Sequence, residues 1–266
     1  MAVGSRFRFR AEYNVDDLGF PEEDRSRRSF GFVGAYHKRP WEFSPYRIPN
    51  EYVCSRLAEL IGLPVPPCVI TYSEDLGEKC IFSILDFNIN RHKLPEIEPD
   101  KFVEHLPDIA AGVLLFDVWI ANSDRHSENL TVDDISAPTL CQVFDHDQAL
   151  FGGNAGKGCD RLTTLFLRLG ITGGPVTGNN RHCLLNEIDS TEHFSKWANA
   201  IWSTPDSVIE RLLRDVLKFK LISHEECELG TKFLINRKNR LTEIIAEYRH
   251  EFTKVVDWNP ERGLFT

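Results

Sequence analysis

The stretch Asp117-Val-Trp-Ile-Ala-Asn-Ser-Asp-Arg-His-Ser-Glu-Asn129, followed downstream by Phe144-Asp-His-Asp147, decides how the rest of the chain is interpreted. It begins inside an almost uncharged run, residues 109–120, which predicts a helix that is sheltered on most sides. The polar residues after this run must lie on a short loop. Those that can bind metal or move protons are Asp124, His126, Glu128 and Asn129. A loop that leaves a rigid element is a common place for chemistry, so this is the candidate functional site.

The composition is that of a folded chain with a sizeable core. The 266 residues are 42% hydrophobic, enough for one large domain or two modest lobes. The net charge of −9 offers no general attraction to nucleic acid or anionic membranes, which require clustered positive charge. We find neither an apolar run of about eighteen residues nor a signal peptide, and expect a cytoplasmic protein without a membrane span. The seven cysteines form no Cys-x-x-Cys pair, so we expect reduced thiols.

Residues 1–90 predict a small α+β lobe. Strand patterns cover 6–10, 29–38, 68–72 and 80–85, with the first as an edge strand and the last two as a hairpin. A helix is predicted over 48–64, with Asn50 as its cap, Glu51 in its first turn, and Gly62 and Pro64 at its end. The following segment, 88–99, has the composition of a linker.

Residues 91–266 predict a larger, mainly helical lobe. Thr204 is expected to cap a helix with Pro205 in its first position. Ser223-His-Glu-Glu226 is a capping box that opens a helical region running toward Phe252. Core or interlobe packing is predicted for Phe194, Trp197 and Trp202. The expected fold class is therefore α+β, with a strand-rich lobe and a helical lobe.

A β-hairpin is predicted directly after the polar loop. Segments 129–133 and 140–145 are strand-like and the residues between them are turn-like. A symmetric hairpin would pair Asn129 with Asp145, with Cβ atoms roughly 5 Å apart. An amide oxygen and a carboxylate would then form a hard-oxygen site suited to Mg²⁺, with Asp147 as the second choice of carboxylate. Asp124, which precedes them, could orient and deprotonate a hydroxyl group.

Two motifs resemble one kinase family. The order Asp-Arg-His-Ser-Glu-Asn in residues 124–129, with the Asp first, resembles the catalytic loop of HipA-like kinases and of the related phosphoinositide kinases. Asn50-Glu51 and then Leu57-Ala-Glu-Leu-Ile-Gly-Leu-Pro-Val-Pro66 are similar to the N-lobe helix of HipA-like kinases. The resemblance covers about residues 30–150. It implies a two-lobed kinase-like fold in which residues 1–90 cover a nucleotide and residues 91–266 carry the catalytic loop and the metal-binding hairpin.

The resemblance also implies a role for each matched residue. Asp124 would be the catalytic base, and Asn129 and Asp145 would hold Mg²⁺. Lys38 and Glu51 would form the ion pair that places the phosphates of ATP.

Other positions in the first lobe are open to more than one interpretation. Arg39 is an alternative to Lys38, because the family usually has its lysine inside the strand. Glu51 could instead be a carboxylate favoured by the helix dipole alone. The segment after Phe82, with Ser83, Leu85 and Asp86, would be the hinge whose backbone meets adenine.

Three features near the catalytic loop are given structural roles. A hydrogen bond to loop backbone is favoured for His126 over proton transfer, and Glu128 is expected to be solvated. The glycine-rich segment 152–158 lacks the spacing of a phosphate loop and predicts a flexible loop comparable to an activation segment.

We therefore expect a HipA-like Ser/Thr kinase that transfers the γ-phosphate of Mg·ATP to a hydroxyl group on a protein, without general nucleic-acid binding. One alternative is a lipid or small-molecule kinase. The other is a pseudokinase that acts as a nucleotide-binding interaction module, which the irregular sequence around Lys38 would favour.

Overall fold

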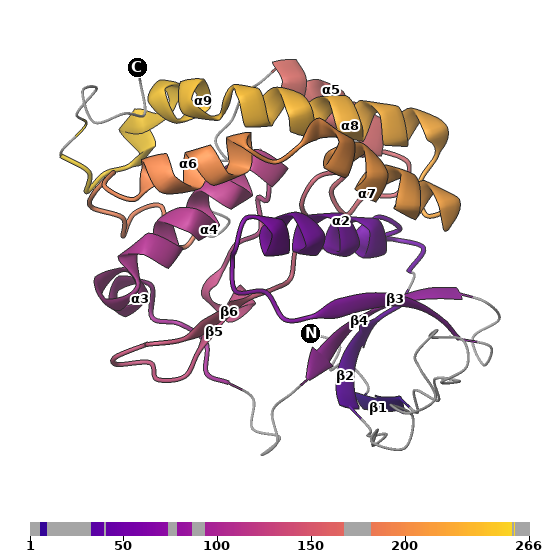
Figure 1. Ribbon diagram of the computed structural model, residues 1–266, viewed down its shortest axis with the longest axis horizontal. Coiled ribbons are helices and arrows are strands. Elements are labelled where there is room, and N and C mark those ends of the chain that lie inside the picture. Colours follow the sequence, from indigo (N-terminus) through magenta and orange to yellow (C-terminus); the bar gives the residue numbers. More distant parts are fainter. Residues whose placement is uncertain are drawn as a thin grey trace, which may run out of the picture.

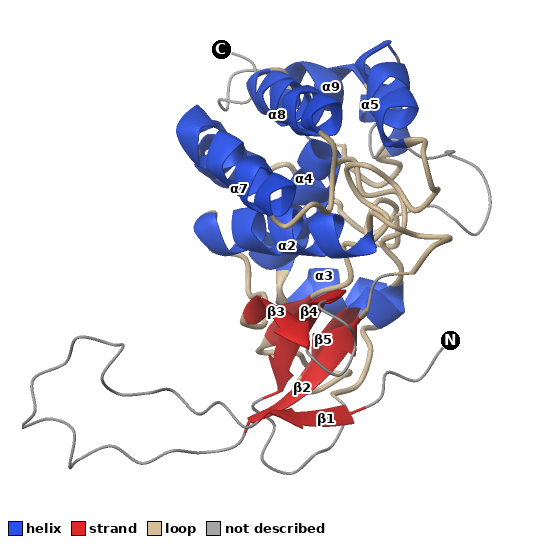
Figure 2. Ribbon diagram, turned by 90° about the vertical axis from the view of Figure 1, so that its right-hand side faces the viewer, coloured by secondary structure: helices blue, strands red, loops and turns tan. Residues whose placement is uncertain are grey.

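The computed structural model describes residues 6–9, 33–39, 41–73, 79–86, 94–167, 182–256 and 258. A small β-sheet lies on one side and most of the helices lie on the other, with helix α2 between them (Figures 1 and 2). The chain thus combines a small antiparallel sheet with a larger helical part, as the predicted α+β class requires.

The sheet has four antiparallel strands. They are β1 (Arg6–Phe9), β2 (Val33–Lys38), β3 (Cys68–Ser73) and β4 (Lys79–Asp86), in the spatial order β1-β2-β4-β3. The predicted edge strand and the predicted hairpin are both confirmed. Lys38 is the last residue of β2 and lies opposite Phe82.

Helix α2 (Arg47–Leu60) lies between the sheet and helix α7 (Asp206–Lys218) and contacts both. Its predicted end at Gly62, with φ +87°, and Pro64 is confirmed. Its predicted start is wrong, because Tyr46 is the N-cap residue and Asn50 lies inside the helix. Proline is tolerated in a first helical turn, so Pro49 allows the helix to begin upstream of Asn50. Glu51 consequently lies beyond the first turn.

Helix α4 (Pro107–Ile120) is the centre of the helical part. Its side chains from Ala110 to Ile120 are all buried, as the uncharged run predicted. It packs against α6 (Phe194–Trp202), α8 (His224–Asn239) and α9 (Leu241–Glu247). The remaining helices are α3 (Pro99–His105), α5 (Gly158–Leu167) and the 3₁₀ turns Ser127–Asn129 and Arg249–Glu251. No helix in the described ranges is long and apolar enough to cross a membrane.

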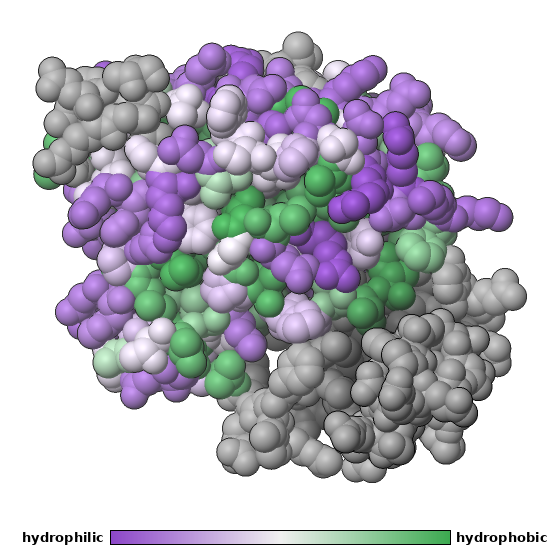
Figure 3. Space-filling model, viewed as in Figure 1, coloured by the Kyte–Doolittle hydropathy of each residue, from purple (hydrophilic) through white to green (hydrophobic). Residues whose placement is uncertain are grey.

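Several details of the helical part differ from prediction. The capping box at Ser223 is confirmed, but α7 is capped by Pro205 and not by Thr204, whose hydroxyl donates to the carbonyl of Ala200 over 3.4 Å. Phe194 and Trp197 are buried as expected, whereas Trp202 is 65% exposed. The face drawn in Figure 3 mixes polar with apolar side chains, and single exposed apolar side chains are ordinary on protein surfaces. Free thiols are present at Cys54, Cys68, Cys141, Cys159, Cys183 and Cys227.

The predicted hairpin is present, but its register differs by one residue. Strands β5 (Leu130–Val132) and β6 (Cys141–Val143) pair Leu130 with Val143, so the backbone of Asn129 meets Phe144 and not Asp145. The turn is asymmetric because the carboxylate of Asp133 accepts hydrogen bonds from the Thr139 and Leu140 amides. Such side-chain bonds set a turn locally, and a symmetric pairing cannot anticipate them.

The predicted linker ends as part of this small sheet. The amide of Ile97 donates to the carbonyl of Leu130 over 3.3 Å, and the amide of Val132 donates to that of Pro95 over 3.0 Å. Residues 95–97 therefore run beside β5 and fix the entry into the helical part.

Candidate active site

The end of helix α4 sets the direction of residues 122–129, the loop that the sequence predicts to be catalytic and that we call the catalytic loop. Ala121 has left-handed backbone with φ 53°, which ends the helix. The side chain of Asn122 then donates to the Asp117 carboxylate over 3.0 Å and accepts from the amide of Asp124 over 3.2 Å. The loop that carries Asp124 therefore starts at a buried side chain, Asn122, that is hydrogen-bonded on both sides.

A buried ion cluster stabilises this loop from within. Arg125 is fully buried and forms a two-pronged pair with Asp117, with Nε–Oδ2 at 2.7 Å and Nη2–Oδ1 at 3.0 Å. His182 Nε2 lies 3.0 Å from Asp117 Oδ2. Burial alone would raise the pKa of Asp117, but Arg125 and His182 hold it well below its usual range. The cluster therefore consists of the ionised Asp117 carboxylate, which contacts the Arg125 guanidinium and the His182 imidazole.

Arg125 also connects the catalytic loop to the loop after β6. Its Nη1 donates to the carbonyl oxygen of Phe144 over 2.6 Å and to that of Asn129 over 3.2 Å. One guanidinium thus fixes the backbone on both sides of the site.

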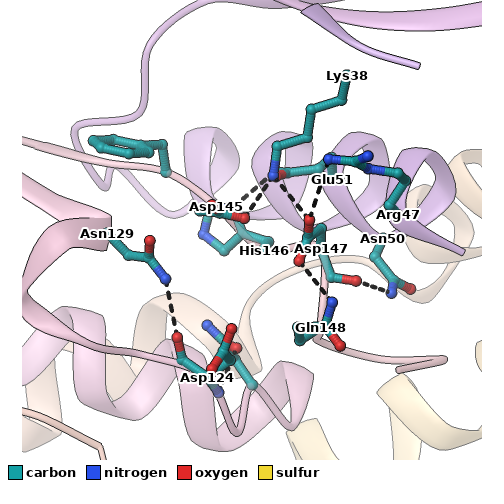
Figure 4. Close-up of polar contacts among 12 residues, drawn as sticks. Lys38, Arg47, Asn50, Glu51, Asp124, Asn129, Asp145, His146, Asp147 and Gln148 are labelled. Atoms are coloured by element: carbon teal, nitrogen blue, oxygen red, sulfur yellow. Dashed lines mark hydrogen bonds and ion pairs between the residues drawn. The ribbon is translucent and has the colours of Figure 1, made fainter. Parts of the chain in front are cut away.

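Asn129 and Asp124 lie together at the catalytic loop (Figure 4). The side-chain nitrogen of Asn129 donates to the Asp124 carbonyl over 2.9 Å. Its side-chain oxygen has no hydrogen-bond donor among the described residues, which leaves it available to a cation. The carboxylate of Asp124 is accessible to solvent. Partial burial and the charge of Asp147 raise its pKa, against the opposite effects of His126 and Lys38.

Lys38 reaches three carboxylates from the end of β2. Its Nζ contacts Glu51, lies 2.5 Å from Asp145 Oδ1, and lies 3.2 Å from Asp147 Oδ2 (Figure 4). Burial alone would lower the pKa of Lys38, but the charges of Glu51, Asp145 and Asp147 raise it above its usual value. Lys38 is therefore a permanent cation that links the sheet, helix α2 and the loop after β6.

Glu51 is ionised although no solvent reaches it. Burial would raise its pKa, but Lys38 and the neighbouring His146 lower it well below the usual range. His146 Nδ1 lies 3.5 Å from Glu51 Oε2, and its ring packs edge-on against Phe116 with ring centres 5.7 Å apart. The position of Glu51 on one face of α2 thus places its charge against β2 and against the β6 loop.

The residues after β6 complete an acidic group. Asp145 has left-handed backbone with φ 61°, which is uncommon outside glycine and turns the chain sharply. Burial and the charges of Glu51 and Asp147 raise the pKa of Asp145, against the effect of Lys38. Carboxylate oxygens of Glu51, Asp145 and Asp147 all lie within 4.8 Å of one another. This set of hard oxygen donors fits a divalent cation such as Mg²⁺, although the Lys38 ammonium lies among the same oxygens.

Two side chains from the start of α2 also contact this loop. The guanidinium of Arg47 lies 3.8 Å from the Asp147 carboxylate. Asn50 donates to the carbonyl oxygens of Asp147 and Gly152, and Gln148 donates to the Asp147 carboxylate over 3.0 Å.

The structure brings together most of the residues that the sequence singled out. Lys38, Glu51, Asp145 and Asp147 are in direct contact, and Asp124 and Asn129 are neighbours on the loop that Arg125 ties to them. His126 is exposed and Glu128 is partly exposed. Loop 152–158 contains two glycines with positive φ.

The predicted hinge residues lie in the strand next to the one that ends at Lys38. Ser83, Leu85 and Asp86 lie in strand β4, whose side chains the structure does not describe. Ser83 is paired with both β2 and β3, whereas Leu85 and Asp86 are paired with β2 alone. Their role toward adenine stays a prediction.

Sequence reasoning missed the residues that support the site. They are Asp117, Arg125, His182, His146, Arg47 and the loop-binding role of Asn50. A signal was present for the first two, since Asp117 is the one acidic residue in its apolar run and a buried carboxylate requires a partner. For His182 and His146 no local pattern gave such a signal.

Comparison with solved structures shows a protein of similar fold. The chain is similar in structure to CtkA, a proinflammatory kinase from Helicobacter pylori, with a TM-score of 0.56 over 85% of this chain and 90% of that chain. The two sequences are 14% identical, so the likeness shows a kinase-like fold and no more. The curated proteins include no match.

Residues 38–155 match the family model described as HipA-like kinase. This region contains Lys38, helix α2, the catalytic loop and the acidic group. The match confirms the resemblance drawn from the motifs.

Proposed function

We propose that the protein is an ATP-dependent phosphotransferase that passes the γ-phosphate of Mg·ATP to a hydroxyl group on a protein. The observation that carries the proposal is the contact of Lys38 with Glu51, Asp145 and Asp147, beside Asp124 and Asn129. Phosphoryl transfer needs positioning and charge stabilisation more than covalent chemistry, and this group offers both.

Lys38 would contact the phosphates of ATP. A protonated lysine held by a buried carboxylate is a fixed positive charge, so it binds phosphate without first being reorganised. Glu51 would orient Lys38, because its own pKa is depressed and it remains ionised. This ion pair supports an active kinase over the pseudokinase alternative, which the irregular sequence around Lys38 favoured.

Asn129 and Asp145 would hold the cation, with Asp147 as a further ligand. Mg²⁺ in this position would neutralise charge on the phosphates as it develops. The side-chain oxygen of Asn129 is oriented for such a role because its nitrogen is engaged by the Asp124 carbonyl.

Asp124 would accept the proton of the attacking hydroxyl. The hydroxyl oxygen forms a bond to the γ-phosphorus, the bond from that phosphorus to the bridging oxygen breaks, and ADP leaves with the electron pair. A solvent-accessible carboxylate beside the cation ligands can be reached by an acceptor side chain.

The remaining assignments belong to the same proposal. Residues 1–90 would form a lobe that covers the nucleotide, with adenine against the backbone at Ser83, Leu85 and Asp86. Residues 91–266 would form the catalytic lobe, and the protein would act in the cytoplasm.

Radiolabelled ATP provides the test. Purified protein with Mg²⁺ should label itself or a protein in a cell lysate, and Asp124→Asn should lower the rate about 10²- to 10⁴-fold. Asp145→Asn should abolish labelling, whereas Asp100→Asn, at an exposed aspartate in α3, should not change it. Labelling that survives both active-site changes would overturn the assignment.

The same preparation distinguishes the alternatives. A lipid kinase would label an organic extract and a small-molecule kinase would label the acid-soluble aqueous fraction, and neither would label protein. A pseudokinase would bind ATP equally with and without Mg²⁺, or not at all, and would label nothing.

A further inference from the structure

Asn50 is a fully buried side chain whose three hydrogen bonds all end on one distant loop. Its nitrogen donates to the carbonyl oxygens of Asp147 and Gly152 over 2.7 and 3.1 Å, and its oxygen accepts from the amide of Phe151 over 3.2 Å. A flipped amide would place its oxygen against two carbonyl oxygens, so only one orientation satisfies the site. The side chain is therefore specific for the backbone of residues 147–152.

The loop after β6, residues 144–152, carries Asp145 and Asp147 and is called the acidic loop. It is held at two places, by Arg125 and by Asn50. Arg125 binds the carbonyl of Phe144, just before Asp145, and Asn50 binds the carbonyl of Asp147, just after it. Asp145 lies between the two supports with left-handed backbone. A non-glycine residue in this conformation persists when its surroundings overdetermine it, and these two supports do so.

Asn50 and Glu51 are consecutive on α2 and act on the same loop. Glu51 meets Lys38 and His146 with its charge, while Asn50 meets the backbone of Asp147. Figure 4 shows both side chains beside Asp147. Helix α2 therefore presents one side chain to the lysine and one to the loop that carries the other two carboxylates.

We propose that Asn50 is a positioning residue for the cation site, holding the backbone of Asp147 so that the carboxylates of Asp145 and Asp147 face Lys38 and Glu51. The inference rests on the proposed function, because it assigns Asn50 to the cation site of that reaction. This role differs from a general role in stability. Replacing Asn50 breaks hydrogen bonds to the loop and leaves the hydrogen bonds within α2 in place.

The test compares two variants of helix α2. Asn50→Leu has a similar size and removes all three bonds. Val53→Ala removes buried packing from the same helix but none of the three hydrogen bonds to the loop, so it is the control for lost stability. Binding of Mn²⁺ in the presence of a non-hydrolysable ATP analogue, binding of the analogue without metal, and the melting temperature are measured for each.

Asn50→Leu should weaken Mn²⁺ binding about tenfold or more, as losing a residue that orients metal ligands does. Metal-free binding of the analogue should change much less, and Val53→Ala should lower the melting temperature without changing Mn²⁺ affinity. Asn50→Ser keeps a polar side chain in the buried site but is too short to make the same three bonds, so it is measured in the same way if Asn50→Leu does not fold.

Two outcomes would overturn the inference and are distinguishable. Wild-type Mn²⁺ affinity in folded Asn50→Leu or Asn50→Ser would overturn it alone. Wild-type protein that binds neither Mn²⁺ nor the analogue would overturn the proposed function, and the inference with it.

Discussion

The guanidinium of Arg125 donates to the carbonyl oxygen of Phe144 over 2.6 Å while it pairs with the buried carboxylate of Asp117. The catalytic loop and the acidic loop after β6 are therefore attached to helix α4 through one side chain. Because neither charge can reach water, the pair is stable only as a pair.

Replacing Arg125 with methionine should lower the free energy of unfolding by about 3–5 kcal/mol, because the Asp117 carboxylate would be left buried without its cation. Denaturation in urea measures this change. Arg214→Met is the matched control, since Arg214 pairs with Glu210 on an exposed face of α7, and it should change stability by less than about 1 kcal/mol. Equal effects of the two changes would contradict the role of Arg125.

Replacing Lys38 with methionine should reduce phosphotransfer about 10²- to 10³-fold, the usual effect of removing a preorganised group that stabilises developing charge. Initial rates at saturating ATP measure the loss. Lys101→Met removes an exposed lysine that pairs with its neighbour Glu104 in α3, and it should leave the rate unchanged. Unchanged activity of Lys38→Met would show that a cation other than Lys38 contacts the phosphates.

Stability should fall as the pH drops through the normal range of histidine, because of His182. Both ring nitrogens are occupied in the neutral form, since Nε2 faces Asp117 and Nδ1 accepts from the amide of Leu184 over 3.2 Å. Burial lowers the pKa of His182 below its model-peptide value of 6.5, although Asp117 acts in the opposite direction. The unfolded chain therefore binds the proton first, so stability is complete above about pH 6.5 and decreases below it.

His182→Gln should flatten this dependence between about pH 6.5 and pH 5, since glutamine does not titrate. Urea denaturation at a series of pH values for both proteins gives the comparison. Parallel curves for the two proteins across this range would show that His182 does not contribute.

Gly112 is a packing position in α4. A Cβ atom there would lie 2.4 Å from the ring of Trp197 in α6, so Gly112→Ala should destabilise the fold by about 1–3 kcal/mol. Trp197→Leu removes the ring, and the double variant should be less destabilised than the sum of the single changes, because the clash no longer exists. Additive losses in a double-mutant cycle would contradict this contact.

Local sequence patterns predicted most of the elements correctly. The uncharged run of α4, the capping box at Ser223 and the strand hairpin in the first ninety residues are set by periodicity and turn chemistry, which act over a few residues. The errors lie where a distant contact outweighs a local preference. Asn50 resembles a cap but is recruited by a loop, and the β5–β6 register follows from the side chain of Asp133.

The sequence by itself determined which side chains the site contains, because the acidic and amide residues around Asp124 follow a buried helix at a recognisable spacing. The tertiary structure alone decided which of them meet. Lys38 contacts Asp145 across 107 positions of the chain, and that contact exists because β2, α2 and the loop after β6 converge on one point. Packing of these elements depends on the whole core, so no local pattern in the sequence reports it.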